Sequence, residues 1–464
     1  MKKYNKNIEL LAPAGNLEKM KTAFAFGADA AYVGIPDFSL RVRINNFTIA
    51  GIKQAVKYAH KRGKKIYVTA NIFAHNKHIA KLPAHIKKLK EINVDGIFIS
   101  DPAVLRIIKK IWPKAKIILS TQANCANWQA AKFWHEQGVS RIILSRELSI
   151  KEIAEIHKKV PKLELECFVH GALCMAYSGR CFLSKFFSNR DANLGDCIQP
   201  CRWAYKVATA TAGSRRGGKS EELKVKSDKN YFITPEGRDE LLELVEEKHG
   251  SYILNSQDLC LIKRLDELKK AGVNAFKIEG RAKSVYYIAN VVGAYSYAIQ
   301  RTKKITKKEL NFLHKELEEK LYNRGYTEGF MFGNGKMAQN IKKSHKKCKW
   351  EFCGTVYNAN PRINATTFAE ATEVKNAANS NNANDKYNIF IKVHNSLRVG
   401  DEAEIVMPKY DIIKMRIKNM TDSETGETLE QAHGGQGRIV IIESNREIPQ
   451  YSVIRCKVIK ISNL

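Results

Sequence analysis

Four cysteines stand close together in two segments, FVHGALCMAYSGRC (168–181) and LGDCIQPCRW (194–203). They are Cys174, Cys181, Cys197 and Cys201, with six, fifteen and three residues between successive members. Four thiolates can hold a structural zinc ion or an iron–sulfur cluster. Zinc sites usually use two closely spaced pairs, whereas spacings in iron–sulfur proteins vary more. The spacing alone therefore leaves iron–sulfur, zinc and an unligated set open.

The elements that must position these cysteines follow one repeating pattern from residue 8 to about 170. A short apolar run alternates with an amphipathic helical stretch, which indicates a parallel sheet. With an eighth run at 274–280 and a helix after it, the pattern predicts an α/β fold of the (β/α)8 TIM-like barrel type, with a doubly wound sheet as the alternative. The first seven runs are Glu9–Ala12, Ala31–Gly34, Ile66–Ala70, Gly96–Ser100, Ile117–Ser120, Arg141–Leu144 and Leu163–Val169.

The cysteines open an insertion, 170–255, that is too long for a simple loop and follows strand seven. This places them at the C-terminal face, where such barrels carry their active sites. We expect a helix at 256–272, and its Cys260 is an alternative to Cys201 as fourth ligand. The barrel domain should span 1–335, a basic linker 336–349, and a small C-terminal antiparallel β-barrel domain 350–464.

Polar side chains fall at or just past the strand ends on this same face, which makes them candidate pocket residues. Several arginines converging on one mouth suit a carboxylate-bearing ligand through paired hydrogen bonds. The alternative is that these arginines lie on the surface and pair with nearby acids. The candidates are Asn16, Arg41, Arg43, Asn71, Gln122, Arg146, Glu279 and Arg281, with His170 at the end of strand seven.

The charge balance points to a polyanionic partner. The chain has 78 basic and 47 acidic residues and a net charge of +31. Nucleic acid is the first candidate partner, an anionic membrane surface the second, and a generally lysine-rich composition the neutral explanation. The N-terminal segment has no apolar signal region and no run is long enough to span a membrane, so we expect a cytoplasmic protein.

The quoted segments, together with ELLAPAGN, ADAAYVG, NSQDL and FKIEGRAKS, resemble the collagenase-like peptidase family. The resemblance covers residues 8 to 330, and RGYTEGF and the β domain extend it. The branch that the chain resembles makes 5-hydroxyuridine at the wobble position of tRNA, and other branches hydroxylate ribosomal RNA or a ubiquinone precursor. The resemblance implies a [4Fe–4S] cluster, independence from molecular oxygen, and prephenate as the donor of the hydroxyl oxygen.

Carried over by position, the cluster ligands are the four cysteines. We expect Arg41, Arg43, Arg146 and Arg281 to hold the carboxylates of this small dicarboxylate co-substrate, with Asn71 and Gln122 beside them. Proton-transfer or polar roles fall to His170, Tyr177 and Glu279. The lysine run 336–349 and the β domain are expected to bind the tRNA backbone.

Two other classes of protein compete with a tRNA uridine hydroxylase. One is the collagenase-like peptidase of the family name, although the chain has neither an H-E-x-x-H pair nor a G-x-S-x-G elbow. The other is a non-catalytic RNA-binding protein with a structural zinc. A hydroxylase acting on ribosomal RNA is a third alternative, within the hydroxylase class.

Overall fold

The computed structural model describes most of both predicted domains, and statements below about what is absent concern these residues alone. Of the short segments 231–233, 242–244 and 358–359 only the backbone is described. The described residues are 8–39, 47–174, 176, 184, 190, 196–199, 201, 231–233, 242–244, 255–301, 304–333, 345–346, 348–359, 387–435 and 437–458.

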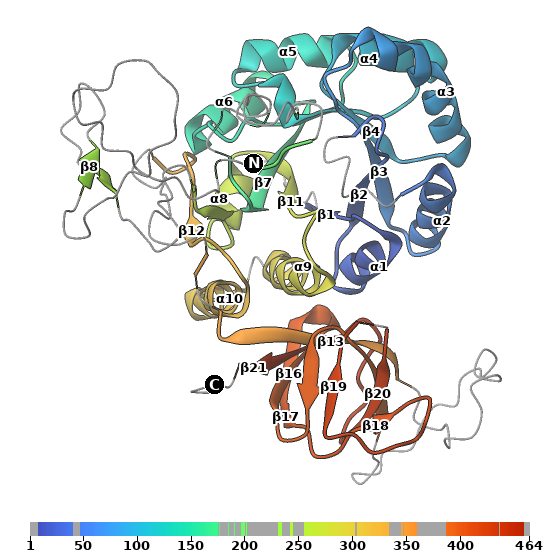
Figure 1. The fold of residues 1–464 in the computed structure, drawn as a ribbon. Helices are drawn as coiled ribbons and strands as arrows, with labels where there is room; N and C mark the ends of the chain where they lie inside the picture. Colours follow the sequence, from blue (N-terminus) through green and yellow to red (C-terminus); the bar gives the residue numbers. More distant parts are fainter. Residues whose placement is uncertain are drawn as a thin grey trace, which may run out of the picture.

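Eight parallel strands form a closed barrel, as predicted (Figure 1). The ring closes because β11 pairs in parallel with both β1 and β7. The strands are buried along nearly their whole length, as expected of a sheet covered by helices on its outer face. They are β1 (Glu9–Pro13), β2 (Ala30–Gly34), β3 (Lys65–Ala70), β4 (Gly96–Ile99), β5 (Ile117–Leu119), β6 (Arg141–Ile143), β7 (Glu164–Gly171) and β11 (Val273–Ile278).

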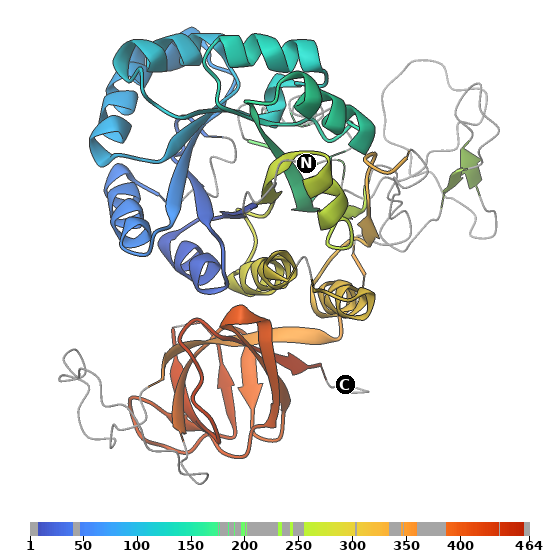
Figure 2. The ribbon, with the colours of Figure 1, turned by 180° about the vertical axis from the view of Figure 1, so that it is seen from behind.

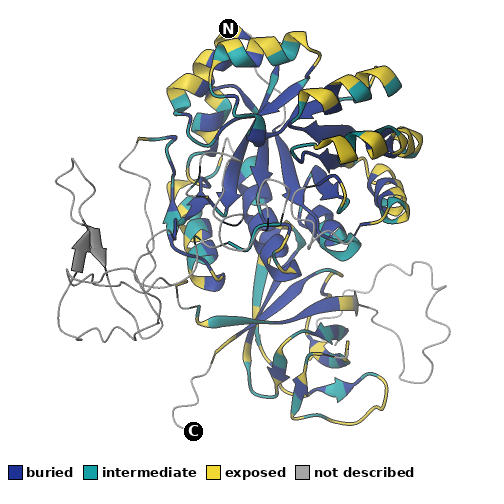
Figure 3. Ribbon diagram, turned by 45° about the horizontal axis from the view of Figure 1, so that its top comes forward, coloured by how far each residue is buried: buried dark blue, intermediate teal, exposed yellow. Residues whose placement is uncertain are grey.

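Helices surround the barrel, with buried inner and exposed outer faces (Figure 3). Most begin at a side chain that accepts a hydrogen bond from the first turn. Asn16, which we expected in the pocket, is one of these caps: its Oδ1 accepts from the backbone N–H of Lys19 at 2.9 Å. The helices are α1 (Leu17–Ala25), α2 (Ile49–His60), α3 (Asn76–Ile92), α4 (Pro102–Ile111), α5 (Trp128–Glu136), α6 (Ile150–Lys159), α8 (Leu265–Lys270) and α9 (Val285–Gln300).

The helix expected at 256–272 is wrong in its first half. Asp258–Cys260 form β10, which pairs antiparallel with the end of β7 and parallel with β12 (Tyr326–Thr327). The four apolar residues from Leu259 to Ile262 are all buried, so the run does not have the one-sided pattern of a surface helix. Only α8 is helical, and Cys260 therefore lies in a strand opposite His170.

After the barrel, α10 (Lys307–Lys320) leads through β12 to an antiparallel β domain, drawn in orange and red in Figures 1 and 2. Its main sheet has the order β17-β16-β21-β13-β14-β20-β18, and β15 pairs with β19 separately. The prediction of a β domain rests on the runs EFCGTVYN, KYNIFIKVHN, GDEAEIVMP, RIVIIES and YSVIRCKVIK. Each of these runs contains a strand, whereas β17 and the shorter strands were not predicted. The strands are β13 (Trp350–Ala359), β14 (Tyr387–Val393), β15 (Ser396–Arg398), β16 (Glu402–Met407), β17 (Asp411–Arg416), β18 (Thr421–Asp422), β19 (Gln431–His433), β20 (Ile439–Ser444) and β21 (Val453–Lys457).

The β domain packs on α9 and α10 through a buried charged residue, Arg455. Its side chain is 0% exposed and donates to Glu404 of β16 at 2.7 Å, to Glu316 of α10 at 2.5 Å and to Asn290 of α9 at 3.2 Å. Tyr410 of the domain joins the hydrophobic core of the barrel. The two domains are therefore held together by buried contacts rather than by a linker alone.

Two short elements complete the described chain. Within the insertion, β8 (Tyr231–Ile233) pairs with β9 (Leu242–Leu244). Most of the predicted linker 336–349, and residues 360–386 of the β domain, lie outside the described residues. Among the helices that the structure describes, none is long and apolar enough to cross a membrane.

Candidate functional site

The barrel interior is filled by side chains in layers, because alternate residues of each strand point inward. Along β3 the layers run from Tyr67 at the N-terminal end, through Thr69, to Asn71 at the C-terminal mouth. Tyr67 contacts Glu9, Thr69 contacts Arg281, and Asn71 contacts residues after β5. The inward side chains of this one strand therefore meet different kinds of partner at different depths of the barrel.

The lowest layer is an ion-pair network around Arg141, which is 3% exposed. Its guanidinium lies 2.6 Å from Glu9, 2.8 Å from Glu164 and 3.2 Å from Glu166. Burial alone would raise the pKa of Glu9, but the charge and hydrogen bond of Arg141 outweigh it and lower that pKa to about 2. The network fills the N-terminal end of the barrel interior with charged side chains that pair with opposite charges.

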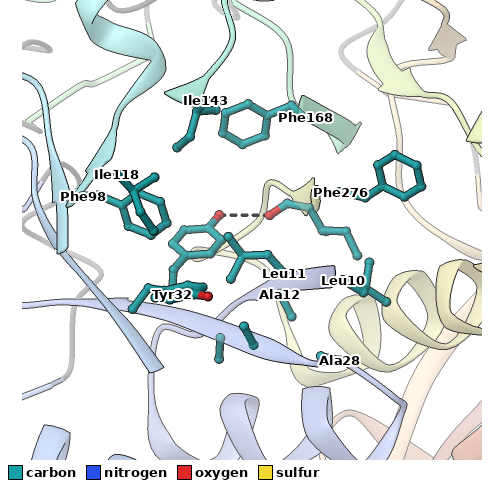
Figure 4. Close-up of a cluster of buried hydrophobic side chains, with 14 of the residues drawn as sticks. Leu10, Leu11, Ala12, Ala28, Tyr32, Phe98, Ile118, Ile143, Phe168 and Phe276 are labelled. Atoms are coloured by element: carbon teal, nitrogen blue, oxygen red, sulfur yellow. Dashed lines mark hydrogen bonds between the residues drawn. The ribbon is translucent and has the colours of Figure 1, made fainter. Parts of the chain in front are cut away.

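The middle layer is aromatic and contains one buried amine, Lys277 of β11. Its Nζ lies 3.0 Å from Glu166 Oε1 and 3.8 Å, 4.3 Å and 5.5 Å from the ring centroids of Phe98, Tyr32 and Phe168. Burial lowers the pKa of Lys277 to about 8. Figure 4 shows the rings gathered in the centre of the barrel. Lys277 was not predicted, although it stands two residues before Glu279.

The mouth of the barrel carries two of the expected pocket residues, Asn71 and Gln122, and their carboxamides contact each other. Asn71 Nδ2 donates to Gln122 Oε1 at 2.7 Å, and Ser120 Oγ lies within hydrogen-bond distance of both amides. Asn71 is 8% exposed and Gln122 4% exposed. Within the described chain, Asn71 Oδ1, Gln122 Nε2 and the nearby Ser145 Oγ have no hydrogen-bond partner. Leaving such a group buried costs roughly 1–3 kcal/mol.

Two of the four predicted arginines lie at this mouth. Arg281 is 6% exposed and donates to Ser39 Oγ at 2.7 Å and Thr69 Oγ1 at 3.3 Å. The guanidinium of the half-buried Arg146 stacks 4.1 Å from the ring centroid of Phe168. The alternative explanation, that these arginines lie on the surface, therefore does not hold for Arg281. The other two, Arg41 and Arg43, lie outside the described residues.

His170 is a packed residue rather than an exposed one. Its ring is 1% exposed and lies 5.3–6.0 Å, centroid to centroid, from the rings of Tyr287, Tyr295 and Tyr326. Burial lowers its pKa to about 3, so the imidazole is neutral. This environment fits a scaffold role, and proton transfer by His170 stays a prediction.

Glu279 lies at the end of β11, beside the end of β7. Its backbone N–H donates to the His170 carbonyl at 2.9 Å, and its own carbonyl accepts from Tyr287 at 2.9 Å. The predicted role of its carboxylate stays open. Tyr177, the third predicted catalytic residue, lies outside the described chain.

A glycine allows the chain to turn from β7 into the cysteine segment. Gly171 has φ +110°, and a Cβ there would lie 2.7 Å from the backbone oxygen of Glu279. Both the left-handed conformation and the close approach therefore require glycine. The turn carries the chain to Cys174, three residues later and exposed.

An ion pair that was not predicted holds this segment in place. Arg324, just before β12, donates to Asp258 of β10 at 2.6 Å and 3.0 Å and to the Leu173 carbonyl at 3.5 Å. Ser256 Oγ donates to the same carbonyl at 2.5 Å. The residue before Cys174 is thus fixed from two directions. The motifs NSQDL and RGYTEGF contain these residues, but their spacing in sequence gives no sign that they meet.

Three of the four predicted cysteine ligands are described. Cys197 and Cys201 are half-buried, and the backbone N–H of Gln199 donates to Cys197 Sγ at 3.3 Å. Such N–H···S bonds are typical of cluster ligands, so this thiol fits the role. Cys181 lies outside the described residues, and among those described no three potential ligands form a metal-binding group. The four-thiolate site stays a prediction.

Cys260 differs from these thiols. It is 5% exposed within β10, and the Tyr295 hydroxyl donates to its Sγ at 3.8 Å. Burial raises its pKa to about 11, which disfavours the thiolate that metals bind. Its surroundings favour a core role over that of a substitute ligand.

Comparisons with known proteins agree with this architecture. Residues 15–341 match peptidase family U32 and residues 374–455 match the peptidase family U32 C-terminal domain. The chain is 43% identical to tRNA hydroxylation protein P of Haemophilus influenzae, over 70% of this chain and 74% of that protein. It is 35% identical to tRNA hydroxylation protein P1 of Bacillus subtilis, over 91% and 89% respectively. It is 31% identical to a collagenase of Porphyromonas gingivalis, over 70% and 74%. The chain therefore belongs to peptidase family U32, and it carries the C-terminal domain of that family.

Proposed function

We propose that this protein is an RNA-modifying enzyme that hydroxylates the wobble uridine of tRNA to 5-hydroxyuridine. The observation that carries the proposal is the composition of the barrel mouth. Buried arginine, unsatisfied carboxamides and a cysteine segment held by Arg324 occur at one end of the barrel. The names of the two tRNA hydroxylation relatives support the same reading.

In this proposal Cys174, Cys181, Cys197 and Cys201 hold a [4Fe–4S] cluster. The N–H of Gln199 that points at Cys197 Sγ supports the assignment, because hydrogen bonds to cluster sulfurs tune the reduction potential. The cluster would supply redox or Lewis-acid chemistry. The residues of the chain would fix its place at the end of β7.

The second reactant in the proposal is prephenate, which supplies the hydroxyl group without molecular oxygen. The hydroxyl group replaces hydrogen at C5, and the donor takes that hydrogen in exchange, so the base is oxidised by two electrons and the donor is reduced by two. Arg281 and Arg146 are suited to its carboxylates, since guanidinium groups pair with carboxylates through two parallel hydrogen bonds. The aromatic layer below them offers an apolar floor formed by Tyr32, Phe98 and Phe168. Arg41 and Arg43 complete the proposed set.

The net charge of +31 supports binding of the RNA backbone. Binding should weaken steeply with salt, because phosphate contacts release counterions. The proposed contact surfaces are the lysine run at 336–349 and the β domain. Ribosomal RNA is the alternative substrate within this class.

Deleting the gene tests the proposal most directly. Mass analysis of tRNA nucleosides from the deletion strain should show that 5-hydroxyuridine and its derivatives have disappeared, and the wild-type gene should restore them. Unchanged tRNA nucleosides together with a lost hydroxylated nucleoside in ribosomal RNA would move the substrate to the ribosome. If neither RNA changes, the proposal is wrong.

A peptidase is the second candidate, because a relative that is 31% identical is named a collagenase. The same anaerobically purified protein separates the two functions. A hydroxylase should contain iron and absorb broadly in the visible range, and it should leave gelatin and collagen intact. Colourless, zinc-containing protein that cleaves these substrates would favour the peptidase.

A further inference from the structure

The carboxamide pair at the mouth leaves one hydrogen-bond acceptor and one donor unused. Asn71 donates through Nδ2 to Gln122 Oε1, so its Oδ1 remains, and the Nε2 of Gln122 remains on the other side. Neither atom has a partner in the described structure, and both side chains are more than nine-tenths buried. Buried polar groups are almost always satisfied, so two neighbouring exceptions at a barrel mouth point to a missing ligand.

One hydrogen-bond donor and one acceptor of the pair stay unused whichever way the two amides are turned. If both carboxamides rotate by half a turn, Gln122 donates to Asn71, and Asn71 Nδ2 and Gln122 Oε1 become the unused atoms. Ser120 Oγ, 3.2 Å and 3.1 Å from the two amides, can donate to one and accept from the other in either state. In either state the pair therefore keeps one unused donor and one unused acceptor.

Building on the function proposed above, we propose that Asn71 and Gln122 read the N3 and C4 edge of the target pyrimidine. In the state described here, Asn71 Oδ1 accepts from N3–H of uracil and Gln122 Nε2 donates to O4. This edge adjoins C5, the carbon that is to be hydroxylated. Enzymes that modify a base commonly take it out of its stack and bind its Watson–Crick edge in this way.

A carboxylate fits this pair less well than a pyrimidine does. Both oxygens of a carboxylate are acceptors, so one would meet the donor of Gln122 while the other faced Asn71 Oδ1 with like lone pairs. The arginines at the same mouth offer hydrogen-bond donors only, so they suit the two acceptor oxygens of a carboxylate. The two kinds of side chain thus divide the mouth into a base site and an anion site.

Because both amides can rotate, we also expect the site to bind either uracil or cytosine. Cytosine presents an acceptor at N3 and a donor at N4, which match the rotated state of the amides. Wild-type protein should therefore bind anticodon loops with uridine or cytidine at the target position with affinities within about tenfold of each other. A methyl group on N3 removes the donor and fills the space of the hydrogen bond, so 3-methyluridine should bind at least roughly tenfold more weakly than uridine.

The sharpest test is Gln122→Glu, which keeps the size of the side chain and removes its donor. The carboxylate also accepts from Asn71 Nδ2 and so keeps Asn71 Oδ1 turned towards the base. The variant then presents two acceptors, each pyrimidine loses one of its two hydrogen bonds, and uridine and cytidine loops should both bind about tenfold or more weakly. Ser100→Ala is the matched control. Ser100 donates only to the Asn71 and Ile72 carbonyls in the described chain, so its removal should leave the binding of both loops unchanged.

Binding of fluorescent anticodon stem-loops to the full-length protein supplies the measurement, and unfolding midpoints verify that the variants fold. Equal binding of uridine and 3-methyluridine loops, or undiminished binding of both pyrimidines in Gln122→Glu, overturns the inference. So does a Gln122→Glu variant that changes only the prephenate requirement of hydroxylation. Wild-type protein that binds no loop and hydroxylates no tRNA would instead overturn the proposed function and this inference with it.

Discussion

Arg324 and Asp258 form a buried ion pair that ties the chain beyond the barrel to the strand beside the cysteines. Two nitrogens of the Arg324 side chain donate to Asp258 Oδ1, and its backbone N–H donates to Oδ2 at 3.2 Å. Burial tends to raise the pKa of Asp258, but Arg324 outweighs it and keeps that pKa below its ordinary value. Both oxygens of the carboxylate are engaged, so removal of the arginine leaves a charge without compensation.

Arg324→Met should therefore lower the free energy of unfolding by about 3–5 kcal/mol, as expected when one partner of a buried pair is removed. Urea denaturation measures the change. Arg264→Met is the control, because Arg264 pairs with Glu328 at 2.8 Å while one third of its side chain is exposed. That pair should contribute at most about 1 kcal/mol. Equal losses in the two variants would show that Arg324 has no special role.

The ion-pair layer at the base of the barrel predicts a specific dependence on acid. Glu9 has a folded pKa of about 2, below its ordinary value of 4.5. Its carboxylate therefore stabilises the fold above the ordinary value, and this contribution is lost as the pH falls towards 2. The loss should reach about 3 kcal/mol relative to Glu9→Gln. Stability curves that stay parallel between about pH 5 and pH 3 would contradict it.

The proposed cluster predicts different effects for substitutions of its ligands and of Cys260. Cys174→Ser and Cys201→Ser should lose most of the bound iron and the visible absorbance, because each removes one of four ligands. Cys260→Ser should keep both, since its side chain lies within the packed sheet. Iron analysis of anaerobically purified protein makes the comparison. Loss of iron in Cys260→Ser with retention in Cys201→Ser would reverse the assignment of the fourth ligand.

The contact between the domains should make them unfold together. Arg455→Met removes the arginine that pairs with Glu316 and leaves Glu404 with Lys320 alone, and it should cost about 3–5 kcal/mol. Calorimetry should then show two transitions where the wild-type protein shows one. Arg446→Met, which removes an exposed pair with Asp411, should change the unfolding free energy by less than about 1 kcal/mol. One unchanged transition in Arg455→Met would mean that apolar contacts suffice.

The barrel was predictable because its strands are short apolar runs that alternate with amphipathic helices. The segment from Leu259 to Ile262 was misread because a short continuous apolar run fits either a buried helix or a buried strand. Its pairing with β7 decided the outcome, and that pairing depends on residues nearly ninety positions apart in sequence. Strand β17 was missed for a related reason, since DIIKMR shows no strict alternation.

Some residues of the site could be predicted from the sequence, and others could not. Asn71, Gln122 and Arg281 follow strand ends, and the barrel geometry alone brings them to one mouth. Arg324 gave no such signal, because it meets Asp258 only through the way the chain after α10 returns to β10. Lys277 looked like an ordinary polar residue in FKIEG, and only its inward direction on β11 places it beside Glu166.

The addition of β12 to the barrel has a consequence for the order in which the protein is made. The outer wall beside β7 is completed by residues 324–331, and the Met331 carbonyl accepts from the N–H of Ile150 at the start of α6. The last barrel strand ends at Ile278, well before this segment emerges from the ribosome. During synthesis the barrel therefore lacks this segment beside β7 and the cysteines until residues 324–331 have emerged. A chain that stops after α9 would contain all eight strands and still lack this side of the enclosure.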